Sequence, residues 1–444
     1  MMNGALPARL DRPSPVALLQ QLIRFDTTNP PGNEMPCIQY IRNLLRDFGV
    51  ESRLLVKKDP RANLVARING RGDAPPLMLY GHVDVVTTHL QAWTFPPFEG
   101  RLADGCVWGR GALDMKGGVA MMLSAVLDIA AHNWQPAGDI LLVLLSDEEA
   151  GGEFGAEFLV DRYPGLFKGV RYALGEFGGH STYIGSRRFY PIQVAEKQLC
   201  WMKATVRGPG GHGARPMRKG AMGRLGHILT ALDRRRLPVH VTPVAREMVD
   251  RMAAALPGPK GAVLQQLCNP LLTDLLLKLM GENGKDIEPI LRNTVNATIV
   301  NGGEKINVVP SEIQLNLDGR LLPGFGPEDF IAELHAILGK SVELSVTQFD
   351  PSPKAPDMHL FDFLGEVLRD IDPAGVPIPM LMPAFTDARH FARIGIQSYG
   401  FTPLKLPRGF KFFEIIHGAD ERIPTKALEF GARAMKEALM RYRG

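Results

Sequence analysis

Apolar residues along the chain fall into two alternating patterns that predict an α/β domain. Short apolar runs with β-branched residues are typical of buried strands, and stretches with apolar residues at helical spacing are typical of helices. Strands that alternate with helices indicate a largely parallel sheet buried on both faces. The expected strands are Asn63–Ile68, Leu77–Tyr80 and Ile140–Leu145, and the expected helices are Pro15–Arg24, Met35–Phe48 and Gly117–His132.

The pattern changes near Pro191 and predicts a second domain inserted into the first. A helical stretch, Pro243–Met280, is expected to form an inserted bundle, and alternating helices and strands return from Pro327. We therefore expect residues 1–191 and 324–444 to form one domain, and residues 192–323 to form the inserted domain. The other elements expected in the insertion are strands at Gln193–Val206, Thr294–Val300 and Glu312–Leu317, and a helix at Gly220–Arg236.

Composition and charge argue against several classes of function. The 444 residues carry a net charge of only +4, from 51 basic and 47 acidic residues, and no Lys/Arg run is interleaved with aromatics. Nucleic-acid binding is therefore not expected. The first 25 residues lack the apolar core of a signal peptide, and no apolar stretch approaches the roughly 18 residues of a membrane helix. We expect a cytoplasmic protein with reduced thiols, because its four cysteines are far apart and form no CxxC pair.

The first candidate site residues end a buried strand. In the run LMLYGHVDVV, His82 and Asp84 are two residues apart and share a face at the carboxyl end of the strand, where α/β sheets bind ligands. A carboxylate at Asp84 can accept the second N–H of a metal-bound imidazole and so orient the ring. Taken alone, the pair is also typical of a strand-end histidine beside a surface aspartate.

Acidic residues occupy comparable positions in three further segments. Asp114 lies in the Gly-rich loop WGRGALDMKGG before a helix, a position also typical of a helix cap. The apolar run LLVLL leads into Asp147, Glu148 and Glu149, and the run YALG ends at Glu176. Acids at the end of a buried strand repel each other unless a cation offsets them. A solvated acidic turn is the alternative.

A second histidine, His417, follows an apolar run in FFEIIHGADERIP. It completes a set of two histidines and three carboxylates that contains no sulfur. Such nitrogen and oxygen ligands favour zinc, cobalt or manganese, and they suit a pair of divalent ions bridged by a carboxylate. The candidate metal ligands are His82, Asp114, Glu149, Glu176 and His417.

The motifs GHVDVV, GRGALDMKGG, SDEEAGG and IIHGADERIP resemble, in this order, those of the aminoacylase, carboxypeptidase G and succinyl-diaminopimelate desuccinylase family of metallopeptidases. The resemblance runs from FDTTNPPGNE to HGADERIP, nearly the whole chain. It implies a catalytic domain that holds two zinc ions, and a smaller inserted ferredoxin-like lid domain that often forms a homodimer. The insertion Pro243–Met280 resembles that of the branch with carboxypeptidase S and the fatty-acyl amino acid hydrolases.

The resemblance also implies a role for each candidate residue. Asp114 would bridge the metals, His82 and Glu176 would complete one site, and Glu149 and His417 the other. Glu148 would be the general base, taking a proton from water and passing it to the leaving nitrogen, while Asp84 holds His82. A cis peptide is implied at Asp114–Met115. The match is loosest at Glu176, because this chain reads GEF where the family commonly has GEP or an Asp-Glu pair.

Three residues of the expected lid match further family positions. The resemblance implies that His212, in GPGGHGARP, reaches across a dimer to polarise the scissile carbonyl. It implies that Asn307 and Arg320 hold the carboxylate and carbonyl oxygens of the substrate. Arginine suits a carboxylate because its planar fork donates two parallel hydrogen bonds. The alternative for Arg320 is an ion pair with Asp318.

The substrate expected is an N-acyl amino acid or a hydrophobic dipeptide, because an apolar lid could accept a large acyl or aromatic group. The leucines of Pro243–Met280 could instead pack the insertion or a dimer interface. Two other functions stay open on the same fold: hydrolysis of an amidine or carbamoyl group, and a binding protein without catalysis.

Overall fold

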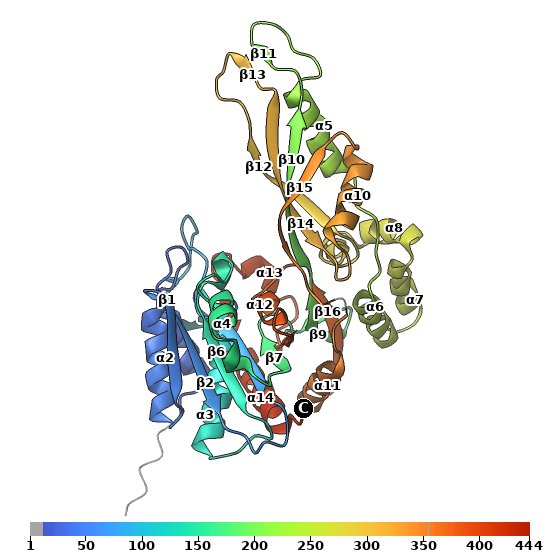
Figure 1. The fold of residues 1–444 in the computed structure, drawn as a ribbon. Coiled ribbons are helices and arrows are strands. Elements are labelled where there is room, and N and C mark those ends of the chain that lie inside the picture. Colours follow the sequence, from blue (N-terminus) through green and yellow to red (C-terminus); the bar gives the residue numbers. More distant parts are fainter. Residues whose placement is uncertain (1–11, 354) are drawn as a thin grey trace, which may run out of the picture. The chain divides into compact units, whose positions relative to one another are not determined.

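The computed structural model describes residues 12–353 and 355–444, which form two compact units (Figure 1). The first unit comprises the described residues up to Val194 together with Asp357–Ile378 and Thr386–Gly444. The second comprises the described residues of Ala195–Pro356 together with Pro379–Phe385. Residues 1–11, which the sequence assigns to the first domain, lie outside the described residues.

A nine-stranded sheet forms the centre of the first unit. Its middle strands β6, β3, β7 and β17 are parallel, whereas β1 and β2 on one side and β9 on the other join it antiparallel. The expected largely parallel sheet is confirmed. In sheet order the strands are β1 (Ser52–Lys58), β2 (Arg61–Ile68), β6 (Ile140–Leu145), β3 (Leu77–His82), β7 (Tyr172–Gly175), β17 (Gln397–Gly400), β9 (Arg187–Glu196) and β16 (Gly375–Met382), with β8 (Thr182–Ile184) paired to β9.

Helices cover both faces of this sheet. The long helix α3 (Lys116–Ala131) packs on β3 and against α1 (Pro15–Ile23) and α14 (Thr425–Arg441). On the opposite face Tyr80, Val143 and Phe391 belong to a buried cluster under α4 (Ala156–Arg162) and α12 (Ala388–Ala392). Because helices cover both faces of these strands, a polar site on this sheet is expected at the strand ends. The remaining elements are α2 (Met35–Asp47), α11 (His359–Ile371), α13 (Phe412–Ile415), and a small sheet of β4 (Arg101–Ala103), β5 (Cys106–Trp108) and β18 (Arg422–Pro424).

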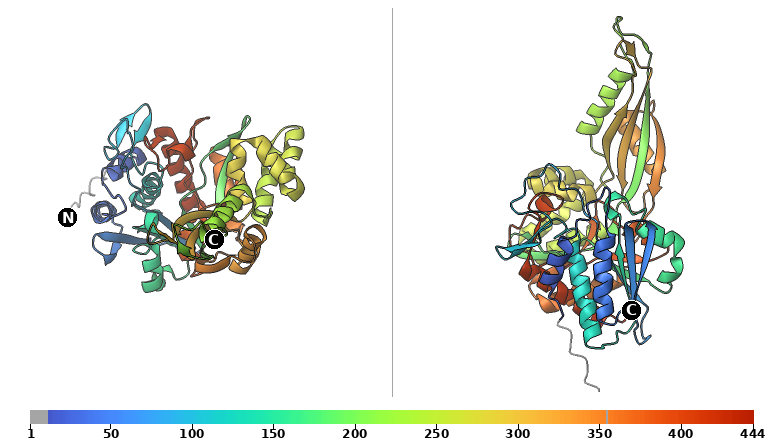
Figure 2. Two further views of the ribbon diagram at one scale, coloured as in Figure 1. Left: turned by 90° about the horizontal axis from the view of Figure 1, so that it is seen from above. Right: turned by 90° about the vertical axis from the view of Figure 1, so that its left-hand side faces the viewer.

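The second unit contains a four-stranded antiparallel sheet in the order β12-β14-β10-β15. Its chain order is strand, helix, two strands, helix, strand, which is the ferredoxin-like arrangement that the resemblance implies. A short two-stranded antiparallel sheet, β11 (Gly211–His212) with β13 (Val308–Val309), lies at the tip of the unit (Figures 1 and 2). The main elements are β10 (Gln198–Arg207), α5 (Ala221–Arg234), β12 (Thr294–Asn301), β14 (Glu312–Leu321), α10 (Pro327–Leu338) and β15 (Glu343–Asp350).

Four helices form the expected bundle between α5 and β12. They are α6 (Pro243–Ala255), α7 (Pro259–Gln265), α8 (Pro270–Met280) and α9 (Glu282–Ile287). The hydroxyl of Thr242 caps α6 by accepting the N–H of Ala245. In α8, Leu277 is buried, but the side chains of Leu271 and Leu279 are 91% and 75% exposed. Packing inside the chain therefore accounts for only part of this leucine-rich segment.

The structure differs from the expected organisation in two places. The region of the expected strand Gln193–Val206 contains parts of two strands, β9 and β10. Lys197 separates them, and its backbone N–H donates to the carbonyl of Met382. The second unit also continues past the expected end at residue 323, because β15 pairs with β10 and α10 packs on α5. Among the described residues, no helix combines the length and apolar character that crossing a membrane requires.

Candidate metal centre

The structure brings all five candidate metal ligands into two groups that share Asp114. Within each group, ligand atoms of the three residues lie within 4.8 Å of one another. His82 ends β3, Glu176 directly follows β7, and Asp114 lies in the loop before α3. Glu149 lies in the short 3-10 turn Glu148–Ala150 after β6, and His417 follows α13. The peptide Asp114–Met115 is cis, as the resemblance implies.

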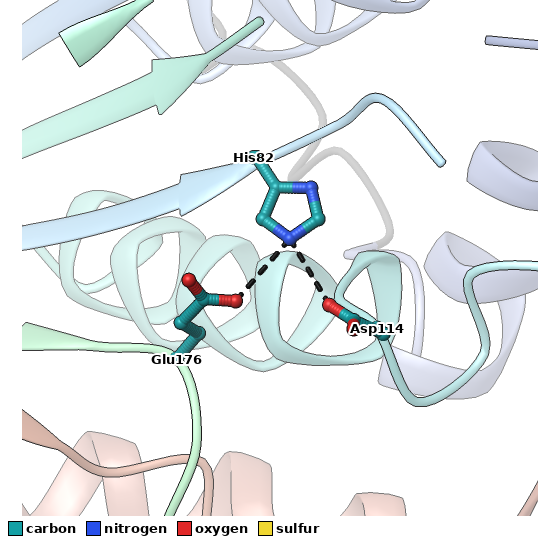
Figure 3. A group of neighbouring side chains, drawn as sticks. All are labelled: His82, Asp114 and Glu176. Atoms are coloured by element: carbon teal, nitrogen blue, oxygen red, sulfur yellow. Dashed lines mark hydrogen bonds and ion pairs between the residues drawn. The ribbon is translucent and has the colours of Figure 1, made fainter. Parts of the chain in front are cut away.

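The first group, His82, Asp114 and Glu176, is buried (Figure 3). Nδ1 of His82 lies 3.0 Å from the backbone carbonyl of Asp84. Because a carbonyl only accepts, Nδ1 carries the proton in this contact, and Nε2 is directed at the carboxylates. Nε2 lies 3.0 Å from Oδ1 of Asp114 and 3.3 Å from Oε2 of Glu176. A ring nitrogen between two carboxylates requires a proton or a metal ion.

The second group, Asp114, Glu149 and His417, is less enclosed. Nε2 of His417 lies 3.0 Å from Oδ2 of Asp114 and 3.5 Å from Oε1 of Glu149. The side chain of His417 is 52% exposed, whereas that of Glu149 is 6% exposed. The two oxygens of Asp114 therefore face one histidine each, which is the arrangement of a carboxylate that bridges two ions.

The donor set fits a pair of divalent cations. Oε1 of Glu149 and Oε1 of Glu176 are buried and have no hydrogen-bond partner among the described residues. Burial disfavours a charge on His82, but hydrogen bonds with Asp114, Asp84 and Glu176 outweigh it and raise the pKa of His82 well above its usual value. The hydrogen bond with Asp114 and the nearby carboxylate of Glu149 raise the pKa of His417 to about 10. Carboxylates that hold protons on both imidazoles this tightly offer strong positions for a cation.

Asp84 faces the His82 N–H with its backbone carbonyl as well as with its carboxylate. The carbonyl lies 3.0 Å from Nδ1 of His82, and Oδ1 of the carboxylate lies 3.5 Å from it. The carboxylate also accepts the backbone N–H groups of Glu148 and Glu149, each at 3.2 Å. Asp84 therefore orients both the His82 ring and the Glu148–Glu149 turn.

Asp147 belongs to a buried network that the sequence did not reveal. Its φ of +72° is unusual for a residue with a side chain, so neighbouring groups must hold it. Its carboxylate accepts hydrogen bonds from Arg61 at 2.8 Å, Asn29 at 3.1 Å and the N–H of Phe154 at 3.0 Å. Asn29 also donates to Asp84, and Glu34 pairs with Arg61. The cation that offsets the charge of Asp147 is therefore Arg61, the first residue of β2.

Glu148 lies beside the first group without belonging to it. Its Oε2 is 4.0 Å from Nε2 of His82, and its side chain is 14% exposed. Burial raises the pKa of Glu148 well above its usual value, and the negative charges of Glu176 and Asp387 add to this effect. A carboxylate with a raised pKa next to a metal site has the properties of a general base that must also release its proton.

Asp387, at the start of α12, is a second buried acid that the sequence did not single out. Its Oδ2 has no hydrogen-bond partner among the described residues. Its Oδ1 would lie 2.7 Å from a Cβ at position 152, where φ is +80°, so only glycine fits there. Gly152, which follows the turn that carries Glu148 and Glu149, thus packs directly against Asp387. No sequence motif predicts this contact.

The lid candidates lie in the second unit, at opposite ends of its sheet. His212 pairs with Val308 in the two-stranded sheet at the tip, and Asn307 lies beside it, accepting the N–H of Gly213 through its carbonyl. Arg320 pairs with Leu199, eight residues before the end of β10 at Arg207. At about 3.3 Å per residue, His212 and Arg320 of one chain are at least roughly 25 Å apart. The structure therefore brings His212 and Asn307 together and separates both from Arg320.

The ion pair considered for Arg320 is present. Its Nε and Nη2 donate to the two carboxylate oxygens of Asp318 at 2.8 and 3.0 Å. Its guanidinium also lies 4.4 Å from the ring centre of Phe385. Nη1 is buried and has no hydrogen-bond partner in the described part of the chain. Asp318 therefore uses one edge of the guanidinium and leaves one nitrogen for another acceptor.

Comparison with known proteins agrees with the motifs. The family model described as peptidase family M20/M25/M40 matches residues 78–441. A probable carboxypeptidase S-like 2 of Dictyostelium discoideum is 29% identical over 374 residues, which cover 79% of this chain and 68% of the relative. The N-fatty-acyl-amino acid synthase/hydrolase PM20D1 of Xenopus tropicalis is 28% identical over 367 residues, which cover 80% and 70%.

A solved structure shares the fold. It is an M20 family metallo-carboxypeptidase of Sulfolobus solfataricus, with a TM-score of 0.70 and 17% identity over 97% of this chain and 99% of that one. The matched residues 78–441 include every candidate ligand of the two groups. The protein is therefore a member of peptidase family M20/M25/M40, and it is an enzyme of the peptidase and amidohydrolase class.

Proposed function

We propose that the protein is a two-metal hydrolase that cleaves the amide bond of an N-acyl amino acid or a hydrophobic dipeptide. One observation carries the proposal: the two oxygens of Asp114 face His82 and His417, each at 3.0 Å. The first ion would be held by His82, Asp114 and Glu176, and the second by Asp114, Glu149 and His417. The donor set supports zinc, with cobalt or manganese as alternatives.

The residues around the two groups divide the work of hydrolysis. When bound, the metal ions would supply Lewis-acid polarisation of the amide carbonyl and lower the pKa of water. Glu148 takes the proton from the attacking water on its carboxylate and delivers it to the leaving nitrogen. Asp84 holds both the His82 ring and the backbone of Glu148, so it fixes the base relative to the first group.

The residues of the second unit are proposed to recognise the substrate. Arg320 would use its unpartnered Nη1 to hold the substrate carboxylate, with Asn307 on a carbonyl oxygen. His212 would polarise the scissile carbonyl. Because His212 and Arg320 lie at opposite ends of one sheet, the proposal assigns His212 to a second copy of the chain in a homodimer.

An apolar group on the substrate is supported by two observations. The relatives include enzymes named for N-fatty-acyl amino acids and a carboxypeptidase S-like protein. Helix α8 exposes Leu271 and Leu279 rather than burying them. We therefore favour a substrate that carries a large acyl or aromatic group in addition to its carboxylate.

The experiment combines metal analysis with substrate profiling. Protein purified without chelator would be analysed by mass spectrometry and assayed on acetyl-, long-chain acyl- and aromatic acyl-amino acids and on dipeptides. We expect about two ions per chain, chelator-sensitive amide cleavage, and faster turnover of the long-chain or aromatic acyl substrates. A preference for acetyl substrates would contradict the apolar assignment. Two bound ions without cleavage of any of these substrates would favour the alternative reaction, on an amidine or carbamoyl group.

A further inference from the structure

A buried ion pair joins the two loops that supply Asp114 and His417. Nη1 of Arg110 lies 2.7 Å from Oε2 of Glu421, although 311 positions separate the residues. The side chains are 1% and 0% exposed. Arg110 precedes Asp114 in the loop before α3, and Glu421 follows His417 by four residues. A charge pair this deeply buried is costly unless further hydrogen bonds satisfy it, and here those bonds lead to the metal groups.

Glu421 organises the backbone of the Asp114 loop. Its Oε1 accepts the N–H of Leu113 at 2.7 Å and the N–H of Asp114 at 3.1 Å. Its Oε2 also accepts the N–H of Gly111 at 3.1 Å. Three backbone donors of the loop are thus directed at one carboxylate, which fixes the position of Asp114.

Arg110 organises the His417 loop. Its Nη2 donates to the backbone carbonyl of His417 at 3.1 Å and to Oε1 of Gln91 at 2.8 Å. Gln91 donates to the same His417 carbonyl at 2.9 Å. His417 has a φ of +59°, a conformation that a residue with a side chain keeps only when neighbouring groups hold it. The two donors to its carbonyl provide that hold.

The first metal group depends less on this pair. His82 and Glu176 are placed by the ends of β3 and β7, inside the parallel sheet. In the described part of the chain, neither residue forms a hydrogen bond or ion pair with Arg110 or Glu421. In contrast, Glu149 and His417 come from turns, and His417 is half exposed. Ligands on strands keep their geometry better than ligands on loops.

We propose that Arg110 and Glu421 are positioning residues: Arg110 sets the affinity of the second metal group, Glu421 sets that of both groups, and the first group binds its ion without Arg110. This inference rests on the proposed function, because it takes both groups to be metal sites. Arg110 fixes His417 relative to Asp114, and Glu421 fixes Asp114 itself. Loss of Arg110 therefore weakens the second group selectively, whereas loss of Glu421 weakens both.

The test is a Zn²⁺ titration of the full-length, metal-stripped chain by calorimetry. Wild type is expected to bind two ions. Arg110→Met, which keeps the length of the side chain, is expected to bind one ion with unchanged affinity and the other about 10- to 100-fold more weakly. His417→Ala gives the reference isotherm for loss of the second group. Arg110→Lys keeps a charge beside Glu421, but its single ammonium cannot reproduce the planar guanidinium that bonds both Glu421 and the carbonyl of His417. It should show the same selective loss.

Arg188→Met is the matched control, because it removes a partly buried partner of Asp372 and touches no residue of either metal group. It should lower the melting temperature and leave both zinc affinities unchanged. Equal weakening of both ions in Arg110→Met and Arg110→Lys, or no weakening of either, would overturn the inference. Wild type that binds fewer than two ions would instead overturn the proposed function.

Discussion

Nε2 of His417 lies 3.0 Å from Oδ2 of Asp114, although 303 positions separate the two residues in the chain. The other oxygen of Asp114 lies 3.0 Å from Nε2 of His82. One carboxylate therefore connects a candidate ligand from the buried end of β3 with a candidate ligand from a loop near the end of the chain. This connection makes the effects of substitutions at Asp114 and at His417 different.

Asp114→Asn is expected to remove both metal ions, whereas His417→Ala is expected to remove only one. The amide of asparagine lacks the second anionic oxygen that a bridging ligand needs. Both groups therefore lose the charge of the shared Asp114 carboxylate. His417 belongs to one group alone. Metal content after dialysis, measured by mass spectrometry, checks both variants. Two ions retained in Asp114→Asn would contradict the bridging role.

Glu148→Gln is expected to lower kcat by about 10²- to 10⁴-fold and to leave the metal content unchanged. The amide keeps the shape of the side chain but cannot accept the proton of water. Because Glu148 lies outside both metal groups, KM should change little. Steady-state kinetics with parallel metal analysis separates the two effects. Turnover within a few-fold of wild type, with two ions bound, would exclude Glu148 as the base.

Mixing two inactive variants is expected to restore activity if His212 acts across a dimer. His212→Ala and Glu148→Gln each disable every site of their own homodimers. A mixed dimer regains one site that has Glu148 from one chain and His212 from its partner. Random exchange of subunits should then give roughly a quarter of wild-type activity. A mixture as inactive as its components, with subunit exchange verified, would place His212 in the same chain as the base.

The positions of the strand-end candidate ligands could be predicted from the sequence because their signal is local. His82 and Glu176 each end an apolar run, and the parallel strands β3 and β7 are neighbours in the sheet. The carboxyl ends of neighbouring parallel strands necessarily meet. Glu148 and Glu149 follow β6 on the other side of β3 for the same reason.

Residues that act through long-range polar contacts could not be predicted in this way. Arg110 and Glu421 are 311 positions apart, and Arg61 and Asp147 are 86 apart. Neither pair has a hydrophobic period or a spacing that signals it. The late boundary of the second unit was missed for a related reason. Helix α10 and strand β15 have the same local pattern as the first unit, and only the pairing of β15 with β10 assigns them.

Zinc affinity is expected to rise with pH, because zinc must displace protons from its ligands. The pKa of His417 is raised to about 10 by Asp114 and Glu149, so in the metal-free chain this imidazole holds its proton between pH 6 and 9. Zinc binds only the neutral ring, and each proton released makes the apparent affinity about tenfold higher per pH unit. Calorimetry in buffers of different ionisation enthalpy measures the release. His417→Ala should release fewer protons; an equal release would contradict the assignment.

Lys197 is expected to make the free energy of unfolding rise with pH above about 7. Its side chain is buried, and its Nζ donates to Oγ1 of Thr294 at 2.9 Å, with no acid within ion-pair distance in the part of the chain described. Burial lowers its pKa from 10.5 to about 7, and the charge of Arg320 adds to this. Between these values the unfolded chain binds the extra proton, so stability increases with pH, by up to about 1.4 kcal/mol per unit. Below pH 7 the full cost of burying the ammonium is present.

Lys197→Met should therefore raise the melting temperature most near pH 6, with a gain that shrinks towards pH 9. Thr294→Val, which removes the acceptor and keeps the amine, should have the opposite effect at low pH. A gain from Lys197→Met that is the same at every pH would mean that the lysine is charged equally in both states.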